Sequence, residues 1–283
     1  MKASVGVFVA FLGLGTMAVA QTKATAVSRS VTVSQGGVAR WAGNCLRCSF
    51  EKQAWKAVEG TCYYPVDMER KPGVYSISRR TTGGKLENAK MTVELKECEK
   101  EDITNFTKTE YIDVSAENLA RNRKESAVIR PLLAFSKAET APTFDLPLSK
   151  PAKPLAKGTD NFGTCRTFNG QARDRHTGTD YPVTGGESIL SVADGTIILA
   201  AGHFYSGNSI YIDHGNGLIS EYFHLKNIEV KENQAVKKGQ KIGTVGDTGR
   251  TTGPHLHLGV RWHGARIDPT LLFGDPTNLP DVR

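Results

Sequence analysis

Short β-type runs interrupted by glycine fill the chain from residue 160 to its end, and this pattern limits the fold more than any other feature. The clearest runs are residues 191–195, 209–213, 241–245 and 255–258. Because glycine and turn residues recur before a helix could complete several turns, no helix is predicted here. The spacing favours an all-β domain over residues 160–283, either sheet-stacked or barrel-like.

A second β-rich pattern occupies the first half of the chain. Between residues 27 and 114, apolar and polar residues alternate in short runs that are separated by glycine, proline and charged turns. This alternation is typical of half-buried strands. We therefore expect a small β-sandwich-like domain with one helix over residues 21–136.

The helix is predicted over residues 116–130, where glycine and proline are absent. Ser115 is of a residue type that caps helix N-termini. The apolar residues that follow, beginning with Leu119, are expected to pack as one stripe against a neighbouring element.

Four prolines with lysine and alanine mark residues 137–159. This composition is typical of a semi-rigid extended linker, so the domain boundary is predicted here. The alternative is that the segment lies along the second domain through Phe144 and Leu146 and partly covers a groove.

The N-terminus has the pattern of a secretory signal peptide. Lys2 precedes an uncharged run that ends in the small residues Ala18-Val19-Ala20. We expect cleavage after Ala20, which removes residues 1–20 and places the mature protein in the periplasm or outside the cell. No other stretch has the ~20 apolar residues of a membrane-spanning helix, so no stable span is expected after cleavage.

The formal charge is +7, and it becomes +6 when Lys2 is removed with the signal peptide. A basic excess of this size suits an anionic cell wall or membrane surface. Nucleic acid would attract the same charge, but the predicted export argues against it as a partner. The oligomeric state cannot be read from the sequence.

Export also permits disulfide bonds. Four cysteines, Cys45, Cys48, Cys62 and Cys98, lie in the first half of the mature chain and allow three pairings. We expect two disulfides among them, with a structural zinc site as the weaker alternative. Cys165 would then remain unpaired, without a catalytic role.

All seven histidines fall in the second domain. His176 and Asp180 are separated by four residues, which places both side chains on one face of a strand or extended loop. The β-branched Thr177 and Thr179 and the intervening Gly178 favour the extended form over a helix.

His255 and His257 alternate with leucines in Gly253-Pro-His-Leu-His-Leu258. In a strand, this alternation puts both imidazoles on one face and the leucines on the core face. Neutral imidazole is a good zinc ligand, and three protein ligands with one open position form a catalytic zinc site. By the same alternation, Tyr222 and His224 are expected to share a face.

These motifs together resemble the lysostaphin-type (LytM-like) zinc metalloendopeptidases over about residues 162–272. The resemblance rests on order and spacing, through the motifs His176-x-x-x-Asp180, Tyr222-x-His224-Leu225, Gly246-Asp-Thr-Gly249 and Gly253-Pro-His255-Leu-His257. It implies an antiparallel β-sheet zinc peptidase domain, which we assign to residues 160–283.

Carried over by position, the resemblance implies that His176, Asp180 and His257 bind zinc. It also implies that His224 and His255 stand beside the metal-bound water, one as a general base and the other as a donor to the oxyanion. Which of the two histidines is the base stays open. The sequence has no His-Glu-x-x-His motif that would indicate a glutamate base.

Other polar residues receive weaker assignments. Tyr222 resembles a groove-lining tyrosine of the family and is a secondary catalytic candidate. Asn169 and Arg173 are expected at the groove edge, His214 in a structural turn, and His203 and His263 on the surface.

The predicted function is hydrolysis of peptide bonds in peptidoglycan stem peptides or cross-links by a zinc-activated water. One alternative is a catalytically silent peptidoglycan-binding activator of cell-wall amidases. It is disfavoured because all the presumed ligands and both catalytic histidines are present. Another alternative is a secreted protease that acts on protein, and only the shape of the groove could exclude it.

Overall fold

The computed structural model describes residues 29–134, 140–153, 158 and 160–283. The predicted signal peptide and the ends of the predicted linker lie outside these residues. Within the described part of the chain, no helix combines the length and the hydrophobicity of a membrane span.

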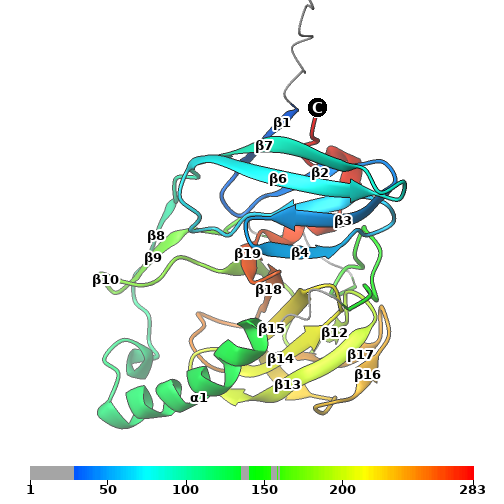
Figure 1. Cartoon of the computed structure of the whole chain (residues 1–283). Helices are drawn as coiled ribbons and strands as arrows, with labels where there is room; N and C mark the ends of the chain where they lie inside the picture. The colour runs from blue at the N-terminus through cyan, green and yellow to red at the C-terminus, as the bar shows by residue number, and fades with distance from the viewer. Residues whose placement is uncertain (1–28, 135–139, 154–157, 159) are drawn as a thin grey trace, which may run out of the picture.

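The first half builds a five-stranded sheet and a separate two-stranded ribbon (Figure 1). The sheet has the order β1-β7-β6-β3-β4, in which only β1 and β7 run parallel, and the ribbon pairs β2 with β5. Their bounds are β1 (Ser30–Ser34), β2 (Val38–Trp41), β3 (Cys45–Phe50), β4 (Gln53–Lys56), β5 (Cys62–Pro65), β6 (Gly73–Thr81) and β7 (Leu86–Glu94). Alternate residues of β1 and β7 are buried, and this half has its own core around Trp55, Tyr64 and Met91.

The second half is an open nine-stranded antiparallel sheet, below the first in Figure 1. Its main path is β11-β18-β15-β14-β13-β16, while β17 pairs with β12 and β15, and β19 pairs with β18. The bounds are β11 (Gly178–Tyr181), β12 (Ser188–Leu190), β13 (Gly195–His203), β14 (Gly207–Asp213), β15 (Leu218–Ile228), β16 (Ala235–Val236), β17 (Lys241–Val245), β18 (Leu256–Trp262), β19 (Ala265–Ile267), η2 (Pro269–Leu272) and η3 (Pro276–Asn278). The predicted all-β class is confirmed.

A small third sheet joins the two halves. Strand β8 (Lys100–Ile103) pairs in parallel with β9 (Cys165–Phe168), which pairs with β10 (Gln171–Ala172). The short helix η1 (Thr109–Tyr111) follows β8. Residues from far apart in the sequence therefore form one ribbon.

The disulfide bonds correct the predicted pairing. Two bonds form, as expected, but they join Cys48 to Cys62 and Cys98 to Cys165. Cys45 is the free cysteine and is buried. The prediction that Cys165 stays unpaired was wrong because the parallel β8–β9 ribbon, which places Cys98 beside it, has no local sequence signal.

Helix α1 (Ala116–Ala134) begins where predicted, and the Ser115 hydroxyl accepts a hydrogen bond from the main-chain N–H of Asn118. The predicted apolar stripe was wrong, because no residue of α1 is buried and Leu119 and Val128 are exposed. The helix is anchored by polar contact instead: the Glu125 carboxylate accepts from the main-chain N–H of Phe204.

The two halves pack tightly against each other. Tyr63 of the first half stacks on Trp262 of β18, with ring centroids 5.4 Å apart. The Asp67 carboxylate accepts two hydrogen bonds from the Arg266 guanidinium. The chain end returns to the first half, where Val282 joins its core (Figure 1).

The described part of the predicted linker, residues 140–153, lies along the second domain. The main-chain N–H groups of Leu148 and Ser149 donate to the carbonyls of Leu272 and Val192, and the side chains of Phe144 and Leu148 are buried. None of these residues lines the cleft that holds the site histidines. The segment therefore packs as the alternative interpretation describes, but away from that cleft.

Candidate metal centre and cleft

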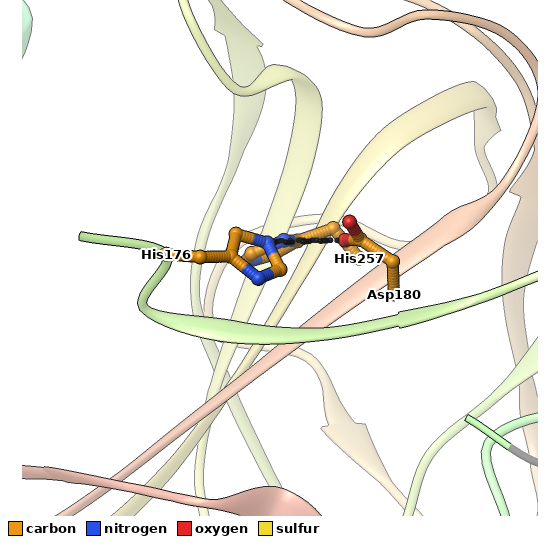
Figure 2. Close-up of side chains that lie close together, drawn as sticks. All are labelled: His176, Asp180 and His257. Carbon is orange, nitrogen blue, oxygen red and sulfur yellow. Dashed lines mark hydrogen bonds and ion pairs between the residues drawn. The ribbon is translucent and has the colours of Figure 1, made fainter. Parts of the chain in front are cut away.

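Two adjacent strands bring the predicted metal ligands together. Asp180 on β11 and His257 on β18 are directly opposite in the antiparallel register. His176 lies four residues before Asp180 and points to the same place, so the three side chains meet (Figure 2). Strand alternation and cross-strand pairing thus explain why ligands 77 residues apart converge.

The ligand atoms are close enough to share one metal ion. Nε2 of His176 lies 2.9 Å from Nδ1 of His257, and Oδ1 of Asp180 lies 3.0 Å from that Nδ1 and 3.2 Å from Nε2 of His176. Ligands at ~2.0 Å from a tetrahedral zinc are separated by roughly 3.3 Å. Two imidazoles and one carboxylate, with one side open to a cleft, therefore fit a catalytic zinc site.

A glycine makes this close approach possible. A Cβ atom on Gly178 would lie 2.5 Å from Nε2 of His257 and 2.5 Å from the carbonyl oxygen of Leu258. Any side chain at this position would push the His257 ring away from β11.

Asn161 and Arg166 hold the ligands in place from behind. Nδ1 of His176 is 2.9 Å from the Asn161 carbonyl, so its N–H donates there and Nε2 remains available for metal. The Asn161 amide and the Arg166 guanidinium both donate to Oδ2 of Asp180, at 3.1 and 2.8 Å. Oδ1 is thereby left to face the ligand cluster. The sequence carried no motif that marked either supporting residue.

The ligands also have suitable charges. Burial disfavours ionised Asp180, but hydrogen bonds from His176, His255 and His257 outweigh it and hold the pKa of the carboxyl well below its usual value. Burial, reinforced by the neighbouring His176, lowers the pKa of His257. A carboxylate and a neutral imidazole are the forms that bind metal.

His224 and His255 flank the open side of the ligand cluster. Nδ1 of His224 donates to the Thr248 carbonyl at 2.8 Å, and Nδ1 of His255 is 2.9 Å from the Gly253 carbonyl. Their ring centroids are 5.0 Å apart, and both line the cleft. Each ring therefore has its Nδ1 engaged by the protein, and Nε2 of His255 also lies 3.4 Å from Oδ1 of Asp180.

The two cleft histidines differ in proton affinity. Burial and the neighbouring His255 and His257 hold the pKa of His224 well below its usual value. Burial also opposes protonation of His255, but Asp180, whose Oδ1 is 3.4 Å from Nε2, outweighs it and raises the pKa. The shifts therefore favour the neutral form of His224 and the protonated form of His255.

Tyr222 does not belong to this site, so its assignment as a catalytic candidate was wrong. Its side chain is fully buried, and its hydroxyl accepts from the main-chain N–H of Val192 and bonds with Ser220. A bulge in β15 is the reason: His224 has a φ of +63°, and the register against β14 shifts between Asn208 and Ile210. The extra residue breaks the alternation that would have paired Tyr222 with His224.

Phe223, which pairs with His257 in the regular β15–β18 register, also lines the cleft. Its ring stacks on His257 with centroids 5.0 Å apart and an interplanar angle of 1°. Phe223 thus fixes the plane of a predicted metal ligand. Simple strand alternation would place it on the opposite face from His224, so sequence reasoning missed it.

Of the remaining predictions for single residues, some are confirmed and others are wrong. His214 is buried and bonds the Asp194 carbonyl and Ser220, a structural role. The predicted exposure of His203 and His263 was wrong, because His203 is 9% exposed and His263 stacks on Trp55. Arg173 lines the cleft, whereas Asn169 forms a turn that binds the backbone of Phe106.

The site lies in a cleft of about 620 Å³. Residues of the second half form most of its lining, and Glu101 and Ile103 of β8 complete one wall. The first half of the chain therefore contributes directly to the cleft.

Fold and site together define a metallopeptidase domain: an antiparallel sheet that presents two histidines and an aspartate at the floor of an open cleft. The family is Peptidase family M23, whose sequence profile matches residues 174–269, and this part of the chain belongs to it.

Relatives support this membership. Peptidoglycan DD-endopeptidase ShyA of Vibrio cholerae is 45% identical over 93 residues, which cover 33% of this chain and 22% of the relative. DD-carboxypeptidase/endopeptidase Mpg of Neisseria meningitidis is 40% identical over 94 residues, 33% of this chain and 22% of the relative. The matched segment is thus about a fifth of each relative.

A solved structure extends the similarity beyond the matched segment. A protein from Pseudomonas aeruginosa, provisionally described as a peptidase M23, superposes with a TM-score of 0.64 at 28% identity. The superposition covers 85% of this chain and 95% of that one. The first half of the chain is therefore included in the shared architecture.

Proposed function

We propose that this chain is an exported zinc metalloendopeptidase of the cell envelope that hydrolyses peptide bonds in peptidoglycan stem peptides or cross-links. The observation that carries the proposal is the convergence of His176, Asp180 and His257 on one point of an open cleft, with His224 and His255 beside it. The names of the relatives supply the substrate class. The two disulfides fit an oxidising compartment.

His176, Asp180 and His257 would hold the zinc. When bound, zinc would supply Lewis-acid activation of the scissile carbonyl and of the attacking water. Neutral His224, which the Thr248 carbonyl orients at the cleft, is the base that we assign to the proton of that water. His255, whose proton Asp180 stabilises, is suited to donate to the developing oxyanion.

The alternatives remain separable from this proposal. A silent amidase activator has no use for intact ligands together with both cleft histidines, and all five are in place here. A protease for protein substrates would use the same site, so digestion of a protein substrate belongs in the test.

The decisive experiment measures zinc content and hydrolysis of purified peptidoglycan, with fragments identified by mass spectrometry. Wild type should bind about one zinc per site and release new peptide ends. His257→Ala should lose both, whereas His224→Ala and His255→Ala should keep zinc and lose about 10²–10⁴-fold in rate. His203→Gln, outside the cleft, is the matched control and should retain both properties.

Each result has a distinct meaning. A folded wild type without metal overturns the ligand assignment. Bound zinc without cleavage of any wall preparation points to the activator, and cleavage of protein but not of peptidoglycan points to the protease. Circular dichroism of every variant establishes that it is folded.

A further inference from the structure

Arg250 is a cleft residue whose charge is favoured at a distance by the Asp174 carboxylate, without an ion pair between the two side chains. Its guanidinium lies over the rings of Phe168 and Tyr205, 5.4 and 4.9 Å from their centroids. Within the described ranges, no carboxylate forms an ion pair with it and no group forms a hydrogen bond with its side chain. The side chain is only partly exposed, so water compensates this charge incompletely.

The other three arginines that line the cleft are already engaged. Arg166 bonds the carboxylates of Glu101 and Asp180. Arg173 donates to two main-chain carbonyls and a glutamine side chain, and Arg175 donates to three main-chain carbonyls. Arg250 is therefore the arginine of this lining whose side-chain donors all remain available to a ligand.

We propose that Arg250 forms a carboxylate subsite that binds a free carboxylate of the peptide stem and determines specificity for it. The substrate class in this inference rests on the proposed function. A guanidinium presents parallel donors that match a carboxylate in a bidentate manner. Peptidoglycan stems carry free carboxylates on their side branches and ends, whereas the backbone of an ordinary protein segment does not.

The position of Arg250 connects this subsite to the reaction. Arg250 lies in the loop between β17 and β18, which is closed by a bridge between Gly246 and His255. The same loop supplies the Thr248 carbonyl that orients His224. A carboxylate held by Arg250 would thus anchor the substrate on the loop that ends at His255 and that orients His224 of β15.

The test is calorimetric binding of an uncross-linked stem tetrapeptide to the zinc-loaded full chain. The probes are L-alanyl-γ-D-glutamyl-meso-diaminopimelyl-D-alanine and the same peptide with its carboxyls amidated. Wild type should bind the acid at least about tenfold more tightly than the amide. Arg250→Gln should abolish that preference. Arg80→Gln, the same change on the exposed β6–β7 hairpin of the first half, should preserve it.

Equal affinity of wild type for acid and amide overturns the subsite, and this comparison needs no variant to fold. An Arg250→Gln variant that weakens both probes equally also overturns it, because a packing role would do that. Acid preference without any cleavage of peptidoglycan retains the subsite and rejects the proposed activity. Cleavage of peptidoglycan without a preference for the acid retains the proposed activity and rejects the subsite.

Discussion

Replacing His263 should reduce the acid sensitivity of the fold. This histidine follows β18 at the boundary of the two halves, where its ring stacks on Trp55 with centroids 4.1 Å apart. Both ring nitrogens are buried, and neither has a hydrogen-bond partner among the described residues. Burial lowers the pKa of His263 from 6.5 to about 3. The folded protein therefore keeps this imidazole neutral well into the acid range.

The direction in which pH changes the free energy of unfolding follows from comparing proton uptake by the folded and unfolded chains. The unfolded chain takes up a proton on His263 as the pH falls below about 6.5, whereas the folded chain does not until about pH 3. The contribution of neutral His263 to the free energy of unfolding is thus complete above pH 6.5, and it is lost as the pH falls from 6.5 to 3. At pH 5, one and a half units below the unfolded pKa, the loss from this residue is about 2 kcal/mol.

The assay is urea unfolding at pH 8 and pH 5, at one fixed zinc concentration, for wild type, His263→Phe and His263→Gln. Both substitutions remove the titrating group, and the other histidines and the metal contribute equally in all three proteins. The drop in free energy of unfolding between the two pH values should be smaller in both variants by about 2 kcal/mol. An unchanged drop in both would refute the argument from burial.

Two further predictions concern the fold around the site. Tyr222→Phe should lower the free energy of unfolding by about 1–3 kcal/mol through the lost bonds to Val192 and Ser220, with kcat/KM on peptidoglycan within about twofold of wild type. A stable variant with a large fall in kcat would instead return Tyr222 to the catalytic residues. Replacing Cys98 and Cys165 together by serine opens a loop between positions 67 apart and should cost about 4 kcal/mol in urea unfolding. A cost below about 1 kcal/mol would contradict the view that this bond stabilises the fold.

The ligand cluster could be predicted because its geometry is local to two strands. His176 and Asp180 share a face through even spacing, and His257 lies on the cleft side of β18 while Leu256 and Leu258 are buried. These relations depend only on the two-residue period of a strand. The order of the motifs along the chain then sufficed to identify the family.

The failures share a different cause. The bulge at His224 requires one unpaired residue, and no turn motif in the sequence predicts it. Because of this bulge, Phe223 and not Tyr222 shares the cleft face with His224. The Cys98–Cys165 bond depends on a parallel pairing of distant segments. Both features are set by tertiary packing, which short-range hydrophobic periodicity does not predict.

The same long-range pairing changes how the role of the first half must be tested. Glu101 on β8 binds Arg166, and Arg166 binds Asp180, so a contact chain leads from the first half to a metal ligand. A deletion that removes the first half would also remove the partner of Cys165 and one wall of the cleft. Loss of activity in such a deletion would therefore reflect damage to the site itself. Point substitution of Glu101, with zinc affinity as the readout, separates support of the metal site from any binding role of the first domain.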